Sequence, residues 1–180
     1  KQVAVLQFIN AHRFVGNRVA KLDPLERQEI PRVPELELAT YGLTEADLDK
    51  TFNTGSLVGP QMATLREIVD IVKTTYCRTV GLEYMYISDQ EQKRWLQQRF
   101  ESVRSQATLS AEQKKHLLER LTAAETLEKY LHTRYVGQKR FSLEGGETAI
   151  AALDAIINTA GNNNVEEVVI GMAHRGRLNV

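Results

Sequence analysis

The stretch VEEVVIGMAHRGRLNV, residues 165–180, decides how the rest of the chain is interpreted. Residues 168–172 are apolar without polar alternation, which is typical of a strand in a parallel sheet that helices cover on both faces. His174, Arg175 and Arg177 follow that run directly. Ligands bind at the carboxyl ends of such strands, because loops diverge there and helix N-termini point amides at anions. The stretch therefore predicts a parallel strand that leads into an anion-binding site.

Each of these side chains also has an ordinary structural explanation. A single histidine is more often a packed residue than a chemical one, and arginines are usually solvated or in surface ion pairs. Gly171 and Gly176 lie within the same stretch, and glycine allows a ligand to approach the backbone closely. The cluster as a whole favours a binding site, although no single member does.

Composition excludes several classes of function. The 180 residues carry 23 basic and 23 acidic side chains, so no overall field favours nucleic acid or an acidic membrane. No apolar run approaches the roughly 20 residues that a membrane span needs. The single cysteine, Cys77, cannot form an internal disulfide, and its amphipathic surroundings favour a packing role. We therefore expect a soluble globular chain and, because it starts with Lys1 inside a helical pattern, a part of a longer protein.

Residues 1–135 are predicted to be mainly helical. Val5 and Phe8 share one face of a first helix, which is expected to end near Gly16. All four prolines lie within residues 22–61, which predicts an irregular arm. The arm contains too many apolar residues for a free linker, so we expect it to lie across a partner surface.

The pattern after the arm predicts three more helices, beginning near Thr64, Ser88 and Ser110, and a short strand over residues 80–87. Ser88 with Glu91, and Ser110 with Gln113, have the spacing of a capping box. Charges of mixed sign on the last of these helices, Glu128 among them, predict a solvated face.

Residues 136–180 are predicted to begin an α/β layer, with a domain boundary near Tyr135. A polar, glycine-bearing segment leads into a helix that is expected to end at Gly161, and the strand of residues 168–172 follows. The predicted fold class is thus mainly α followed by the start of an α/β domain, a parallel sheet flanked by helices.

Two runs in this order resemble a known family. Residues 139–147, KRFSLEGGE, and residues 171–180, GMAHRGRLNV, are similar to motifs of the thiamine-dependent decarboxylating components of 2-oxoglutarate dehydrogenase. Residues 20–25, AKLDPL, and 41–44, YGLT, are similar to the N-terminal region of the same family. The resemblance covers essentially the whole chain, and it identifies the α/β layer as the start of a thiamine-diphosphate-binding domain.

The resemblance implies an activity and its partners. Members use thiamine diphosphate, held by magnesium, to decarboxylate 2-oxoglutarate in the tricarboxylic acid cycle and to pass a succinyl group to a lipoyl-bearing succinyltransferase component. The full-length enzyme is expected to be a homodimer, cytoplasmic in bacteria and in the mitochondrial matrix in eukaryotes. No binding of nucleic acid or membrane is expected.

The resemblance also implies three site residues. His174 is expected to be catalytic and to bind substrate, and Phe141 to line the substrate pocket. Arg175 is expected to face the substrate carboxylate or the cofactor diphosphate. The family's metal motif is expected beyond Val180, so this chain should hold one wall of the site and be inactive alone.

Two alternatives remain open at this stage. The first is a sister 2-oxo acid dehydrogenase or decarboxylase, for example one that acts on 2-oxoadipate. The second is a non-catalytic helical interaction module, in which residues 110–135 present a leucine stripe to a partner.

Overall fold

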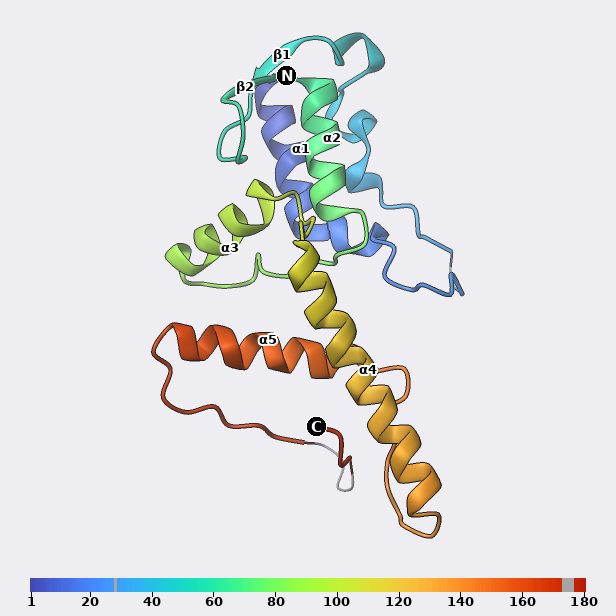
Figure 1. The fold of residues 1–180 in the computed structure, drawn as a ribbon. Coiled ribbons are helices and arrows are strands. Elements are labelled where there is room, and N and C mark those ends of the chain that lie inside the picture. Colours follow the sequence, from blue (N-terminus) through green and yellow to red (C-terminus); the bar gives the residue numbers. More distant parts are fainter. Residues whose placement is uncertain (28, 173–176) are drawn as a thin grey trace. The chain divides into compact units, whose positions relative to one another are not determined.

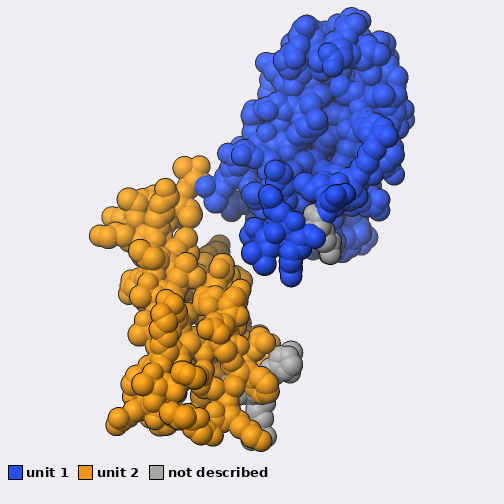
Figure 2. Space-filling model, turned by 90° about the vertical axis from the view of Figure 1, so that its right-hand side faces the viewer, with its two compact units in different colours: residues 1–107 blue, residues 108–180 orange. Residues whose placement is uncertain are grey.

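The computed structural model describes residues 1–27, 29–172 and 177–180. The chain divides into two compact units, unit 1 (residues 1–107) and unit 2 (residues 108–180), which are coloured separately in Figure 2. The predicted boundary near Tyr135 lies inside unit 2, at the residue that caps the end of its first helix.

The chain is mainly helical, as predicted, and it carries one small sheet (Figure 1). Unit 1 contains α1 (Gln2–Val15), β1 (Thr51–Asn53), β2 (Met62–Thr64), α2 (Leu65–Tyr76) and α3 (Gln90–Ser102), and unit 2 contains α4 (Ala111–Arg134) and α5 (Thr148–Asn162). Four short 3-10 helices, η1 (Gly16–Val19), η2 (Pro34–Leu36), η3 (Leu38–Tyr41) and η4 (Glu45–Asp47), lie between α1 and β1. Over the described ranges, no helix combines the length and the apolar character that a membrane crossing requires.

Helices α1 and α2 lie side by side and form the centre of unit 1 (Figure 1). Their buried residues recur every three or four positions, which is the spacing of one helical face. These residues are Val5, Phe8, Ile9 and His12 on α1 and Leu65, Ile68, Ile71, Val72, Thr75 and Tyr76 on α2. Gly16 follows α1 where the pattern predicted an end, and a Cβ there would lie 2.7 Å from Tyr76 Cβ. The close approach of the two helices therefore requires glycine at this position.

Capping side chains explain where two helices begin. The Thr64 hydroxyl accepts a hydrogen bond from Glu67 N–H, and the Glu67 carboxylate accepts one from Thr64 N–H at 2.8 Å. Ser110 and Gln113 form the same reciprocal pair at the start of α4, so the capping box predicted there is confirmed. Each pair satisfies backbone donors that the first helical turn leaves without partners.

The capping box predicted at Ser88 is wrong. Asp89 caps α3 instead, and its carboxylate accepts hydrogen bonds from the N–H groups of Glu91 and Gln92 at 2.8 and 3.0 Å. A carboxylate accepts these bonds more strongly than a hydroxyl and also complements the positive end of the helix dipole.

Part of the arm, residues 22–61, packs on the core of unit 1, whereas Leu22 and Leu25 in its first part are 56% and 71% exposed. Leu43 and Leu57 are 2% and 5% exposed. The arm also contains β1, which pairs antiparallel with β2 and places Phe52 opposite Ala63. Strands of three residues are too short to show a period-two pattern, so the sequence did not reveal this sheet.

The strand predicted over residues 80–87 is wrong. This segment has no strand pairing, yet Leu82 and Tyr84 are only 6% and 3% exposed. Tyr84 Oη lies 2.9 Å from Tyr76 Oη, within hydrogen-bonding distance. Leu82 and Tyr84, two of the residues that favoured a strand, are thus buried in a loop that packs against α2, whereas Tyr86 is 82% exposed.

Helices α4 and α5 pack against each other in unit 2. Each of the two helices buries a small residue, since Ala124 of α4 and Ala151 of α5 are 1% and 4% exposed. His116 Nε2 of α4 lies 2.7 Å from Asp154 Oδ2 of α5.

The strand predicted over residues 168–172 is wrong for this chain. Residues 165–172 have no strand pairing, and Val169 is 93% exposed. A parallel strand needs a neighbouring strand to supply hydrogen bonds, and the described part of unit 2 contains none. The predicted parallel α/β domain is accordingly not formed by the residues that the structure describes.

Candidate functional site

Two of the three predicted site residues, His174 and Arg175, lie outside the described residues. The third, Phe141, lies in the segment between α4 and α5 and is 57% exposed. The structure therefore describes the surroundings of Phe141 and the two family-like segments, which are residues 139–147 and, within 171–180, residues 171–172 and 177–180.

Glu128 of α4 holds both of these segments. Arg140 Nη1 donates to Glu128 Oε2 at 3.0 Å, and Leu143 N–H donates to Glu128 Oε1 at 3.0 Å. Asn179 Nδ2 donates to the backbone oxygen of Ala124 at 2.9 Å and lies 3.4 Å from Glu128 Oε1. One carboxylate therefore connects two segments that lie about 40 residues apart in the sequence.

The Glu128–Arg140 pair is well shielded from water. The two side chains are 12% and 15% exposed. Hydrogen bonds that involve an ionised group are roughly twice as strong as neutral ones, and shielding reduces their screening by salt. Arg140 and Leu143, which lie on either side of Phe141 in the sequence, are thus both bonded to Glu128.

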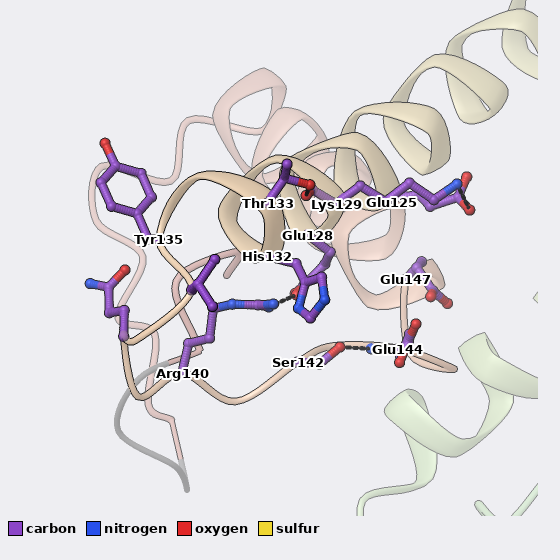
Figure 3. Close-up of a pocket in the computed structure, with 12 residues that line it drawn as sticks. Glu125, Glu128, Lys129, His132, Thr133, Tyr135, Arg140, Ser142, Glu144 and Glu147 are labelled. Atoms are coloured by element: carbon purple, nitrogen blue, oxygen red, sulfur yellow. Dashed lines mark hydrogen bonds and ion pairs between the residues drawn. The ribbon is translucent and has the colours of Figure 1, made fainter.

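A cavity of about 570 Å³ lies beside this cluster, and Figure 3 shows the side chains around it. Helix α4 contributes Glu125, Glu128, Lys129, His132 and Thr133, and the following segment contributes Tyr135, Val136, Gln138, Arg140, Ser142, Glu144 and Glu147. The last turns of α4 and the segment that folds back along them thus form its walls.

The cavity is lined by more acidic than basic side chains. Two of the carboxylates are in ion pairs, Glu128 with Arg140 at 3.0 Å and Glu125 with Lys129 at 2.7 Å. Glu147 accepts a hydrogen bond from Gly145 N–H at 3.1 Å. Acidic side chains therefore predominate around this cavity. The predicted anion site at His174 and Arg175 lies outside the described residues.

Glu128 is a residue whose role the sequence pattern missed. It was assigned to a solvated face, and this assignment is wrong, because the side chain is 12% exposed. Its position four residues after the buried Ala124 places it on the inward face of α4, and this helical spacing was the only available indication.

Comparison with known proteins covers the whole chain. No family model matches it. It is 57% identical over 181 residues to the "2-oxoglutarate dehydrogenase E1 component" of Cupriavidus necator. The chain matches the N-terminal part of this E1 component. Proteins with the same name from Azotobacter vinelandii and Haemophilus influenzae are 53% and 45% identical to it, again along its whole length.

The chain spans only about a fifth of the length of these E1 relatives, 19% of the first two and 20% of the third. The described residues do not themselves form a site for the cofactor that the E1 resemblance implies. The cavity beside Glu128 is acidic, whereas a diphosphate needs cationic or amide donors. No group of three or more His, Cys, Asp or Glu side chains is placed to hold a metal ion in residues 1–27, 29–172 and 177–180.

Proposed function

We propose that this chain is the N-terminal part of an E1 component that oxidatively decarboxylates 2-oxoglutarate and transfers a succinyl group to a lipoyl group. The observation that carries the proposal is 57% identity along the whole chain to a protein named as that component. Identity at this level over so many residues makes a shared fold and a shared role the expected outcome. The proposal includes a homodimeric enzyme with a lipoyl-bearing succinyltransferase as its partner.

Thiamine diphosphate with magnesium would supply the electron sink for decarboxylation in the complete enzyme. We propose that both are bound by residues outside this chain. Within this chain, we assign substrate binding to Phe141 and His174. The phenyl ring would form an apolar wall that limits water at the reacting carbon, and the imidazole would donate a hydrogen bond to the substrate. Arg175 would face a carboxylate or the diphosphate.

Glu128 would act through Phe141 as a positioning residue. It does not reach the substrate in this proposal, but it holds the residues on either side of the phenyl ring, at Arg140 and Leu143. Pre-positioned side chains avoid reorganisation during the reaction, which is why a shift of about 1 Å can reduce the rate strongly.

The test is replacement of His174 in the full-length protein. We expect His174→Ala to lower kcat/KM for 2-oxoglutarate by about tenfold or more, because a hydrogen bond to a charged group contributes roughly 1.5 to 3 kcal/mol. The melting temperature should not change. Lys114→Ala, an exposed residue of α4 that does not line the cavity beside Glu128, is the control and should retain full activity.

Substrate specificity should be measured in the same experiment. If the full-length protein turns over 2-oxoadipate faster than 2-oxoglutarate, the proposed substrate is wrong, although the reaction type is not. If His174→Ala lowers the melting temperature and leaves the kinetics unchanged, His174 is a packing residue and its assignment to the pocket fails.

A further inference from the structure

The side chain of Asn179 connects the last described segment of the chain, residues 177–180, to α4. Its Nδ2 donates to the backbone oxygen of Ala124 at 2.9 Å and lies 3.4 Å from Glu128 Oε1. Glu128 is the residue to which the proposed function gives a role in positioning Phe141. We infer that Asn179 is a further positioning residue of that reaction and that it acts through the Glu128 carboxylate. This role rests on the proposed function, from which the role of Phe141 is taken.

Only a hydrogen-bond donor fits at the position of the Asn179 nitrogen. The two atoms beside it are a backbone carbonyl oxygen and a carboxylate oxygen, and neither can donate. The amide nitrogen carries two hydrogens, so one is available for each oxygen. The bond to Ala124 at 2.9 Å is the stronger one, and the approach to Glu128 at 3.4 Å is a weaker, charge-assisted contact.

Water has limited access to this contact. Ala124 is 1% exposed, and the Glu128 side chain is 12% exposed. Asn179 is itself half-buried, whereas its neighbours Leu178 and Val180 are 53% and 40% exposed. A hydrogen bond in shielded surroundings is electrostatically stronger than the same bond in water, and a donor removed there leaves an acceptor without a partner. The loss of the Asn179 amide should therefore have a measurable effect on Glu128.

Glu128 Oε1 is shared between the two family-like segments. It accepts from Leu143 N–H at 3.0 Å, and Asn179 Nδ2 approaches the same oxygen. The other carboxylate oxygen, Oε2, accepts from Arg140 at 3.0 Å. Donors from both segments thus hold one carboxylate in place, and the loss of one donor leaves the group freer to turn away from the others. A change at Asn179 should consequently be detected at the Leu143 amide.

Asn179→Asp in the full-length protein tests this coupling directly. The substitution keeps the size of the side chain, removes both donor hydrogens and places a second carboxylate beside Glu128. We expect the Leu143 amide to exchange its hydrogen about threefold to tenfold faster, because repulsion between the carboxylates displaces the acceptor of that amide. Hydrogen exchange followed by mass spectrometry, on the peptide that contains Leu143, measures this rate.

Asn158→Asp is the matched control. Asn158 of α5 is exposed, and its Nδ2 also donates to a helix carbonyl, the backbone oxygen of Asp154, at 2.9 Å. The substitution likewise places a carboxylate near an acidic residue of unit 2, but it removes no donor from Glu128. Exchange at Leu143 should therefore be unchanged in this variant.

The kinetics separate a positioning role from a structural one. Asn179→Asp should lower kcat for 2-oxoglutarate by about threefold to tenfold, because a small displacement of positioned groups slows the reacting step. KM should change by less than about twofold, since Asn179 is not assigned a contact with the substrate. The melting temperature should match that of Asn158→Asp. In a Glu128→Ala background, Asn179→Asp should have no further effect on kcat, because the residue through which it acts has been removed.

A positioning role for Asn179 is overturned if exchange at Leu143 is unchanged in Asn179→Asp, or if Asn158→Asp accelerates it equally. It is also overturned if Asn179→Asp has the same effect on kcat with and without Glu128. An unchanged kcat in Asn179→Asp, while His174→Ala loses activity, overturns this role and leaves the proposed function standing.

Failure of the proposed function gives a different result. If the unmodified full-length protein does not turn over 2-oxoglutarate, the proposed function is wrong, and the role of Asn179 in that reaction is wrong with it. Exchange at Leu143 needs no substrate, so it still shows whether Asn179 acts on Glu128. Should Glu128→Ala fail to fold, the comparison of Asn179→Asp with Asn158→Asp decides the outcome without it.

Discussion

The strongest consequence for stability concerns Glu101 of α3, which is 2% exposed in the core of unit 1. Its Oε1 accepts from Arg13 Nε at 2.8 Å and from Tyr76 Oη at 2.6 Å. Its Oε2 accepts from Val58 N–H at 2.9 Å. The ion pair with Arg13 is buried on both sides, with side-chain exposures of 4% for the arginine and 0% for the glutamate.

We expect Glu101→Ala to lower the free energy of unfolding of unit 1 by about 4 kcal/mol. Removing one partner of a buried ion pair typically costs 3 to 5 kcal/mol, because the other charge stays buried without compensation. Burial alone would lower the pKa of Arg13, but the hydrogen bond and charge of Glu101 outweigh it and raise that pKa. The Arg13 guanidinium stays charged after the substitution, because arginine is not deprotonated in proteins even when it is buried. Domains are stable by only about 5 to 15 kcal/mol, so this loss would be a large fraction of the total.

Urea unfolding followed by tryptophan fluorescence measures this effect. The chain has one tryptophan, Trp95, and it lies in α3, so the fluorescence reports on unit 1. Glu91→Ala, an exposed glutamate of the same helix, is the matched control and should cost less than about 1 kcal/mol.

A double variant tests the cause. The double variant Arg13→Met with Glu101→Leu removes both charges. Its loss in free energy of unfolding should be smaller than the sum of the losses of the two single variants, because no buried charge is left uncompensated. The reasoning is refuted if Glu101→Ala unfolds at the same urea concentration as Glu91→Ala, or if the two single effects add in the double variant.

Three further predictions follow from other residues. Glu128→Ala should raise the hydrogen-exchange rate of the Leu143 amide by about tenfold, because that N–H loses a charged acceptor, and an unchanged rate would argue against the role of Glu128. Gly16→Ala should destabilise unit 1 by about 1 to 3 kcal/mol through a clash with α2, whereas Gly137→Ala, which meets no atom within 4 Å, should have little effect on the melting temperature. Burial lowers the pKa of His12 from 6.5 to about 4, so between these pH values the unfolded chain binds a proton that the folded chain does not. The free energy of unfolding should therefore fall by about 3 kcal/mol as the pH drops from 6.5 to 4. His12→Leu should flatten this pH dependence, which urea titrations at about pH 4 and about pH 7 would measure.

Part of the fold was accessible from the sequence because helices depend on neighbours three or four residues away. The apolar stripe of α2 is such a local feature, and it predicted a helix where one forms. The box at Ser110 located α4 in the same way. Where two capping residues compete within one turn, as at Ser88 and Asp89, spacing alone did not decide between them.

The side chains of α3 show a second limit. An aromatic residue at helical spacing is usually in a core, but Trp95 of α3 is 59% exposed, with Arg99 5.4 Å from its ring centroid. Spacing indicates which residues share a face. Whether another element covers that face is a matter of tertiary structure.

The sequence by itself determined the main helices, the cap of α4 at Ser110, the arm and the family to which the chain is similar, since all of these rest on local patterns or on runs of adjacent residues. Only the tertiary structure decided that Glu101 meets Arg13, 88 residues earlier, and that Glu128 turns inward to hold two distant segments. It also decided that residues 165–172 stay unpaired, because a strand exists only where another strand supplies its hydrogen bonds. Such contacts depend on which surfaces the folded chain brings together, and the residues next to a position in the sequence do not reveal them.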